Sequence, residues 1–324
     1  MKFLPTFSDV ERAHERISDY AHYTPVFHSE SINNIAGCDI SFKCENFQKA
    51  GAFKFRGACN AVMSLREAGI DLKKGVATHS SGNHAAALAL AAKMRGLKAY
   101  IVMPVTSSEI KKRAVAGYGA EITFCEPTLE SRESTLEKVT ANTGATEVHP
   151  YNDVNIIAGQ GTAAIELIEE AGQFDIIMAP VGGGGLISGT AIAVKELLPG
   201  CKVIAAEPSG ADDAFRSFQS KKIIPSINPK TIADGLLTSL GTRNFAIILD
   251  KVDNIVTVSE GKIIEAMRLI WERMKIIIEP SSAVPLAAIL ENKVDVKDKR
   301  VGIILSGGNI DLGKLPFKKS DREY

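Results

Sequence analysis

The sequence predicts an α/β protein with two open, twisted parallel sheets, one in a large and one in a small domain. Apolar segments of strand length alternate with amphipathic helical segments along most of the 324 residues. The connections between them are short, which favours parallel strands joined by right-handed crossovers. Several of the apolar segments end in glycine-rich or hydroxyl-rich turns, which are typical of the ligand-binding edge of such sheets.

The first element is a helix near the N-terminus. Ser8 and Glu11 have the spacing of a capping box, and Val10, Ala13 and Ile17 recur on one helix face. Later helices are predicted in an Ala/Leu-rich segment that closes at Gly96, from about Ser107 to Gly117, from about Ser188, and from about Ser259 to Met274.

Several segments have the composition of buried strands. Phe174–Val181 is almost continuously apolar, as a sheet covered on both faces requires. The others are Gly75–Thr78, Lys98–Met103, Glu121–Cys125, Lys202–Ala206 and Val301–Leu305. The strands and helices in the middle of the chain form one consecutive unit. We therefore expect a small domain over residues 75–149 and a discontinuous large domain over residues 1–74 and 150–324.

The composition excludes several classes of protein. Lys+Arg and Asp+Glu are both 38, so the basic excess of a nucleic-acid-binding protein is absent. The uncharged run at 176–194 contains Pro180 and several glycines, which indicates a strand, a loop and a helix start rather than a membrane span. The N-terminus has no apolar leader, and the odd number of cysteines includes no C-x-x-C pair, so we expect a cytoplasmic protein. We expect small, buried, unpaired residues at Cys38, Cys44, Cys59, Cys125 and Cys201.

Three strand ends carry unusual loops: HSSGNH at 79–84, GGGG at 182–185 and SGGN at 306–309. Glycine lets the backbone approach a ligand closely, and a helix start offers unpaired N–H groups to an anion. Gly182–Gly185 therefore predicts a phosphate cradle, with a simple tight turn as the alternative. It matches neither a Walker loop nor a G-x-G-x-x-G motif. The N–H groups of HSSGNH suit a carboxylate, with ordinary helix capping as the alternative.

Lys54 lies between Phe53 and Phe55 in the segment AGAFKFRGA. An amine among apolar groups loses hydration, which lowers its pKa and leaves it free to attack a carbonyl carbon. On the residues alone, a lysine that extends to solvent is the favoured explanation.

Eight motifs occur in order: FKCENFQKAGAFKFRGA, THSSGNH, AGQGT, PVGGGGL, AAEPSGADD, TIADG, IEPSSA and LSGGN. Together they resemble the serine racemase and serine/threonine dehydratase group of pyridoxal-phosphate (PLP) enzymes, from about residue 5 to 313. THSSGNH, AAEPSGADD and WERMK are most similar to the eukaryotic racemases of this group. The resemblance implies the tryptophan-synthase-β-like fold of the fold-type II PLP enzymes, and a homodimer that acts on small amino acids.

The resemblance also implies a role for each motif residue. Lys54 would form a Schiff base with PLP and take a proton from one face of the substrate, with Ser81 as the acid or base on the other face. The cofactor would contact Phe53, Asn83, Gly182, Gly183, Gly184, Gly185 and Ser306, and the substrate carboxylate would bind at Ser80, Ser81, Gly82, Asn83 and His84. Two bases imply racemisation of serine, and loss of the β-hydroxyl implies dehydration to pyruvate and ammonia.

Two further sites are implied by the resemblance. Glu207, Asp213 and the Ala211 carbonyl resemble a site for Mg²⁺, Ca²⁺ or Mn²⁺, although spacing alone favours a solvated acidic loop. In this group, ATP is an allosteric activator that binds between subunits. The positions that hold it are similar to four residues of this sequence: Lys49, Lys111, Tyr118 and Asn309. Ala86 stands where the group commonly has Gln, and this removes a polar contact from the nucleotide region.

The choice of substrate stays open at the level of sequence. His79 and Arg132 resemble residues that meet a second carboxylate, which implies L-threo-3-hydroxyaspartate as a dehydration substrate. In ESRESTLEK, however, Arg132 also fits a surface helix charge. Aspartate racemisation is disfavoured, since HPYNDVN lacks the serines of relatives with that activity.

Other functions stay open as alternatives. A catabolic threonine dehydratase fits the motifs, whereas the biosynthetic type carries a regulatory C-terminal domain for which this sequence has no room. A non-catalytic nucleotide-binding protein on the same fold also stays open. A nicotinamide dehydrogenase is disfavoured by the missing glycine fingerprint.

Overall fold

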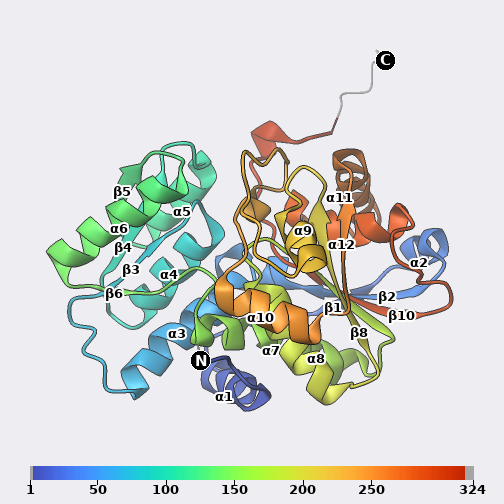
Figure 1. Cartoon of the computed structure of the whole chain (residues 1–324), viewed down its shortest axis with the longest axis horizontal. Coiled ribbons are helices and arrows are strands. Elements are labelled where there is room, and N and C mark those ends of the chain that lie inside the picture. The colour runs from blue at the N-terminus through green and yellow to red at the C-terminus, as the bar shows by residue number, and fades with distance from the viewer. Residues whose placement is uncertain (1–2, 318–324) are drawn as a thin grey trace.

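The computed structural model describes residues 3–317 and contains two sheets, each with helices packed around it (Figure 1). The smaller sheet lies on the left in that view and the larger on the right. Helix α3 (Lys54–Glu67) packs against helices of both parts. The first residue of this helix is therefore held where the two parts of the protein meet.

The larger sheet has six strands, all paired in parallel except β1 and β2 at one edge. In spatial order they are β1 (Val26–His28), β2 (Asp39–Cys44), β10 (Arg300–Leu305), β7 (Ile176–Pro180), β8 (Lys202–Pro208) and β9 (Asn254–Val258). In β7, Ile177 and Ala179 face one core, while Ile176 and Met178 face the other. Cover on both faces explains why this strand is almost continuously apolar.

Helices cover both faces of this sheet. One core includes residues of α1 (Phe7–Ile17), α7 (Val154–Ala171), α8 (Gly185–Leu197), α9 (Asp213–Ser220) and α10 (Thr242–Lys251). The other includes residues of α2 (Glu30–Ala36), α11 (Glu260–Met274) and α12 (Pro280–Leu290). The sheet is thus the middle layer of three, an arrangement typical of α/β proteins.

The smaller sheet has four strands, all parallel. In spatial order they are β5 (Glu121–Cys125), β4 (Ala99–Pro104), β3 (Val76–His79) and β6 (Thr146–Glu147). The helices between them are α4 (Asn83–Met94), α5 (Glu109–Gly117) and α6 (Leu129–Thr143). All these elements come from residues 75–149, and the exact domain boundaries stay a prediction.

Two helix starts differ from the sequence-based predictions. Helix α1 is capped by Thr6 rather than Ser8, because the backbone N–H and the hydroxyl of Thr6 both donate to Asp9 at 2.8 Å. Helix α8 begins at Gly185 rather than near Ser188, because Gly184 adopts a left-handed φ of 92° and turns the chain directly into the helix.

The predictions for the cysteines and for the uncharged run at 176–194 are confirmed. All five cysteines are free and buried. The uncharged run at 176–194 folds into β7, the glycine loop and the start of α8. Among residues 3–317, no helix combines the length and apolarity that crossing a membrane requires.

Candidate active site

The three predicted ligand-binding loops contribute to one cavity, which is open to solvent. Its lining comes from both parts of the fold. It includes every residue that the sequence assigned to cofactor or substrate: Phe53, Lys54, His79, Ser80, Ser81, Gly82, Asn83, His84, Arg132, Gly182, Gly183, Gly184, Gly185 and Ser306. The roles of the individual residues stay predictions.

Lys54 is the first residue of α3, and its part-buried side chain lines the cavity. Its Nζ donates a hydrogen bond to the carbonyl oxygen of Pro150 at 3.0 Å, so the solvent-facing alternative is wrong. Burial lowers the pKa of Lys54 to about 8, against the opposing effect of the Glu279 carboxylate. The neutral amine, which is the form that attacks a carbonyl carbon, is therefore populated close to neutral pH.

The glycine loop connects β7 to α8 and is buried throughout. The backbone N–H groups of Gly182–Gly185 donate to no other residue within the described chain. The Gly183 carbonyl accepts hydrogen bonds from the Gly241 N–H at 3.1 Å and from Asn244 Nδ2 at 2.7 Å, which holds the loop in place. A Cβ on Gly183 would lie 2.5 Å from the ring of Tyr151. Only glycine permits this contact, and free donors at a helix start suit an anion.

The HSSGNH loop connects β3 to the start of α4. Its Ser80 hydroxyl is used internally, because it accepts a hydrogen bond from the Gly82 N–H at 3.2 Å. The N–H groups of Ser81, Asn83 and His84 have no acceptor among residues 3–317. Burial lowers the pKa of His84 well below its usual value, so its ring is neutral. The loop therefore offers backbone donors, rather than a charge, to a carboxylate.

A buried carboxylate that sequence reasoning missed lies beside this loop. Glu279 precedes α12, and its Oε1 accepts a hydrogen bond from Asn83 Nδ2 at 2.8 Å. Its Oε2 has no hydrogen-bond partner among the described residues. Burial raises the pKa of Glu279 to about 7, although the Lys111 ammonium opposes this. The available signal was its position in IEPSSA, directly before a proline that begins an apolar helix.

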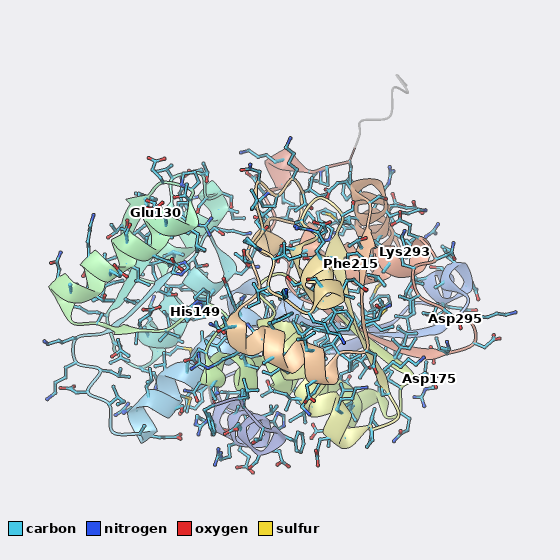
Figure 2. The ribbon with its side chains drawn as sticks, viewed as in Figure 1. Glu130, His149, Asp175, Phe215, Lys293 and Asp295 are labelled. Atoms are coloured by element: carbon cyan, nitrogen blue, oxygen red, sulfur yellow. The ribbon has the colours of Figure 1, made fainter. Side chains whose placement is uncertain are left out.

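Three rings extend from the cavity in edge-to-face contact. The ring centroids of His79 and His149 are 5.9 Å apart, and those of His149 and Tyr151 are 4.7 Å apart. Burial lowers the pKa of His79 to about 4 and that of His149 to about 3, so both rings are neutral at pH 7. Figure 2 shows His149 where the two parts of the fold meet. Tyr151, which also lines the cavity, was not assigned a role from the sequence.

Arg132 lines the cavity from α6. Its guanidinium forms one long hydrogen bond, from Nη2 to the Pro127 carbonyl oxygen at 3.5 Å, and its buried Nε has no partner among the described residues. Arg132 is half-buried and lines the cavity, and its role stays a prediction. A guanidinium without a carboxylate partner is suited to binding one from a ligand.

Glu207, Ala211 and Asp213 lie away from the cavity, at the end of β8 and the start of α9. Burial raises the pKa of Glu207 to about 9 and that of Asp213 to about 6. Both Asp213 oxygens are buried without a hydrogen-bond partner in residues 3–317. No group of three or more His, Cys, Asp or Glu side chains in that range is arranged to hold a metal, so the cation site stays a prediction.

Two of the four residues assigned to ATP line a common cavity. Lys111 and Asn309 line a second, smaller cavity together with Ala86. Lys49 and Tyr118 line neither of the two cavities. The Lys49 amine instead lies 5.8 Å from the ring centroid of Phe55. A nucleotide site between subunits therefore stays a prediction.

The fold and the cavity bring a lysine amine and a glycine loop with free N–H groups together in one site. The family model "Pyridoxal-phosphate dependent enzyme" matches residues 17–307, and the chain belongs to this family. It is 51% identical to the β-hydroxyaspartate dehydratase of Paracoccus denitrificans, over 97% of this chain and 99% of the relative. It is 52% identical to the serine racemase of Dictyostelium discoideum, over 96% of each chain. The crystal structure of the Dictyostelium enzyme aligns with a TM-score of 0.89 at 52% identity, and covers 95% of this chain and 99% of its own.

The residues present fit PLP. The cofactor needs an amine for its aldehyde and donors for its phosphate. Lys54 supplies an amine with a lowered pKa, and the glycine loop supplies N–H groups that have no acceptor within the described chain. Any side chain at Gly183 would clash with the Tyr151 ring, so the loop reaches this close approach to the ring only with glycine at that position.

Proposed function

We propose that the chain is a PLP-dependent serine racemase that interconverts L- and D-serine and also dehydrates serine to pyruvate and ammonia. The observation that carries the proposal is the shared cavity of Lys54, Ser81 and the glycine loop Gly182–Gly185. Similarity to curated serine racemases supports serine as the substrate.

Bound PLP would supply an aldehyde that captures the substrate amine and a ring that withdraws electrons from the Cα–H bond. The protein would hold it with Lys54 at the aldehyde and Gly182–Gly185 at the phosphate. Phe53 and Asn83 would flank the ring, and the Ser306 hydroxyl would face the pyridine nitrogen. Ser306 Oγ is already held 3.1 Å from Ser282 Oγ, which supports a fixed, neutral partner at that position.

Two groups would move the α-proton. Lys54 Nζ, with a pKa of about 8, can accept a proton and return it at the same pH. The Ser81 hydroxyl is exposed in the HSSGNH loop and would exchange a proton on the other side of Cα. Removal on one side and return on the other inverts the carbon. Removal by Lys54 followed by departure of the β-hydroxyl gives dehydration.

The substrate carboxylate would be oriented by the HSSGNH loop. The free N–H groups of Ser81, Asn83 and His84 at the start of α4 support this role. Anchoring the carboxylate on one side and the amine on the other leaves the Cα–H bond with one orientation, which is the main requirement for a fast proton transfer.

Product analysis tests the proposal. Purified enzyme is incubated separately with L-serine, D-serine, L-threonine and L-threo-3-hydroxyaspartate, and the products are separated by chiral chromatography and assayed for keto acids. We expect the opposite enantiomer and pyruvate from both serines. Turnover of L-threonine without formation of D-serine would indicate a catabolic threonine dehydratase instead, and no product from any substrate would indicate a non-catalytic protein.

Dehydration of L-threo-3-hydroxyaspartate is the second candidate function. Arg132 favours it, because the guanidinium lines the cavity without a carboxylate partner among the described residues. Similarity to the β-hydroxyaspartate dehydratase of Paracoccus denitrificans also supports it. His79 would place a neutral ring beside the same carboxylate.

We further propose a site for Mg²⁺, Ca²⁺ or Mn²⁺ at Glu207, Asp213 and the Ala211 carbonyl. The two buried carboxyls with raised pKa values support it, because they lack a compensating cation. A divalent cation would supply that charge and would accept oxygen ligands.

The remaining expectations are a homodimer, a cytoplasmic location and activation by ATP. The five free, buried cysteines support a reducing compartment, which fractionation of cells tests. Sedimentation equilibrium tests the dimer. Kinetics with and without Mg-ATP test the activation at Lys49, Lys111, Tyr118 and Asn309, for which Ala86 provides no polar contact.

A further inference from the structure

Arg56 lies two residues after Lys54 and is completely buried outside the cavity. Its Nε and Nη2 donate to the two oxygens of Glu45 at 2.7 and 2.8 Å. Its Nη1 and Nη2 donate to the two oxygens of Glu166 at 2.5 and 2.6 Å. One guanidinium thus forms two bidentate pairs, which fix its position and its plane more firmly than a single ion pair does.

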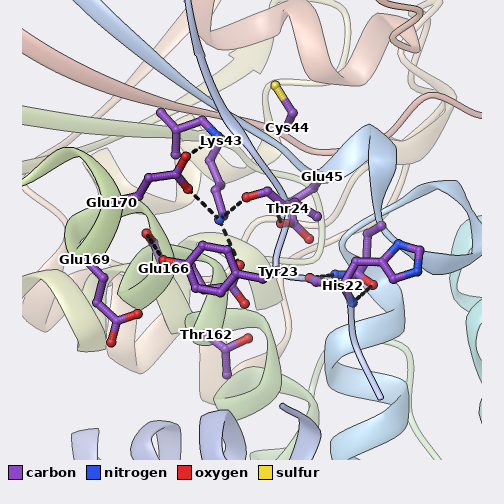
Figure 3. A network of polar contacts seen from close by, with 12 residues as sticks. His22, Tyr23, Thr24, Lys43, Cys44, Glu45, Thr162, Glu166, Glu169 and Glu170 are labelled. Atoms are coloured by element: carbon purple, nitrogen blue, oxygen red, sulfur yellow. Dashed lines mark hydrogen bonds and ion pairs between the residues drawn. The ribbon is translucent and has the colours of Figure 1, made fainter. Parts of the chain in front are cut away.

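A second buried cation balances the charge of this network (Figure 3). Lys43 Nζ lies 2.8 Å from Glu166 and 4.0 Å from Glu170, and it donates to the Thr24 carbonyl oxygen at 2.5 Å. Removing so many charges from water is costly, and a buried ion network contributes little net stability compared with apolar packing. The network is therefore better explained by the positions in which it holds its residues than by a contribution to stability.

The network fixes the first turn of α3 to two other elements. Glu45 directly follows β2, and Glu166 lies on α7. On another side of the same turn, the Phe53 N–H donates to the Ser306 carbonyl oxygen at 3.0 Å. Lys54, whose amine is 3.0 Å from the Pro150 carbonyl, belongs to this turn.

Close backbone contact reinforces the attachment of α3 to α7. A Cβ on Gly159 of α7 would lie 2.6 Å from the Gly57 Cα of α3, so these two helices touch without intervening side chains. Gly57 directly follows Arg56 in the chain. Any rotation of the first turn of α3 would break both the contact and the ion pairs.

We propose that Arg56 is a positioning residue for Lys54. Its two bidentate pairs, with Glu45 and Glu166, fix the rotation and the axial position of the first turn of α3, and this directs Lys54 Nζ into the cavity. The inference rests on the proposed function, because it assumes that Lys54 is the cofactor lysine. In the step concerned, neutral Nζ bonds to the aldehyde carbon, and the carbonyl oxygen leaves as water with both amine protons. A displacement of about 1 Å slows such a step by about 10- to 100-fold.

A graded series of variants weakens the hydrogen bonds of Arg56 step by step with small changes in side-chain volume. Arg56→Lys keeps the charge but forms no bidentate pair. Glu166→Gln keeps the shape of one partner, and Thr162→Val removes only the Thr162 hydroxyl, which accepts from Arg56 Nη1 at 3.2 Å. Arg16→Met is the matched control, because Arg16 Nε donates at 2.9 and 2.8 Å to Glu67, the last residue of α3.

The experiment measures the covalent adduct itself. Apoenzyme is mixed with PLP, samples are reduced with borohydride at timed intervals, and the adduct at Lys54 is quantified by peptide mass spectrometry. Thermal unfolding of each apoenzyme measures stability separately. We expect the rate of adduct formation to fall in the order Thr162→Val, Glu166→Gln, Arg56→Lys, with about a tenfold loss or more for the last. Arg16→Met should lower the melting temperature and keep the wild-type rate.

Three results would decide against the inference. Wild-type rates across the series overturn it, and if Arg56→Lys does not fold, wild-type rates in the other two variants overturn it equally. A loss in Arg16→Met as large as in Glu166→Gln would make the effect one of general stability and also overturns it. An adduct on another lysine of the wild-type protein refutes the proposed function itself. This result distinguishes failure of the proposed function from failure of the inference about Arg56.

Discussion

Asn83 and Glu279 come from different parts of the fold, and yet Asn83 Nδ2 donates a hydrogen bond to Glu279 Oε1 at 2.8 Å. Asn83 begins α4 beside the small sheet, and Glu279 precedes α12 on the large one. The ion pair between Lys111 and Asp234, at 2.6 Å, also joins residues from the two parts. The first contact holds the end of the HSSGNH loop against the start of α12. The charge of Glu279 also acts on Lys54 across the cavity.

The amine of Lys54 should titrate near pH 8 in the apoenzyme, and at a lower pH in Glu279→Gln. Burial lowers the pKa of Lys54 from 10.5 to about 8, and the Glu279 carboxylate opposes this by stabilising the ammonium form. Removing that carboxylate removes the opposition, so the pKa falls further. The rate of Lys54 acetylation against pH, followed by mass spectrometry, measures the midpoint. A wild-type midpoint near 10.5, or an upward shift in the variant, contradicts the assignment.

Ser81→Ala should separate racemisation from elimination. Without the hydroxyl, only Lys54 remains to move the α-proton, so D-serine turnover and racemisation should fall by about 100-fold or more. Pyruvate formation from L-serine needs only Lys54 and should stay within severalfold of wild type, which provides the internal control. Turnover of D-serine at close to the wild-type rate would refute the two-base assignment.

Arg132→Ala should reduce turnover of L-threo-3-hydroxyaspartate more than turnover of L-serine. The guanidinium would contact the β-carboxylate of the first substrate, which serine lacks. We expect about a 10- to 100-fold greater loss in kcat/KM for hydroxyaspartate, since a charged hydrogen bond is worth about 1.5–3 kcal/mol. Lys138→Ala removes an exposed positive charge from the same helix and should leave the ratio unchanged. Equal losses for both substrates in Arg132→Ala would argue against the contact.

Asp213→Asn should abolish stabilisation by Mg²⁺. In the wild-type protein, Mg²⁺ at 100 times its dissociation constant should add about 2.7 kcal/mol to the free energy of unfolding, which calorimetry detects as a higher melting temperature. Asp212→Asn is the matched control, because Asp212 is paired with Arg216 at 2.8 Å. If Mg²⁺, Ca²⁺ and Mn²⁺ all leave the wild-type melting temperature unchanged, no cation site exists here.

The strands and the loops of the cavity were accessible to sequence reasoning because their signals are local. The apolar run of β7 and the glycines directly after it are contiguous, so the position of the glycine loop follows from a strand that must end before a helix begins. Parallel topology then brings the loops at the carboxyl ends of the strands together. The orientation of the Lys54 side chain could not be predicted, because flanking Phe residues do not reveal whether an amine points into a cavity or out of it.

Contacts between segments that are distant in the sequence could not be predicted from the sequence. Glu279 meets a residue 196 positions away, and Arg56 joins Glu45 to Glu166, so neither role has a local pattern. The prediction of the residue that caps α1 was wrong for another reason. Thr6 and Asp9 form a second capping box two residues before the predicted one, and tertiary packing decides between two such signals.

Every proposed role in the cavity depends on a covalent bond between PLP and Lys54, which borohydride makes permanent. Holoenzyme is reduced with borohydride and digested, and the peptide that carries the pyridoxyl group is identified by mass spectrometry. We expect a single modified lysine at position 54 and loss of the visible absorbance band at about 410–420 nm on reduction. A pyridoxyl group on a different lysine, or on none, would show that Lys54 is not the cofactor lysine.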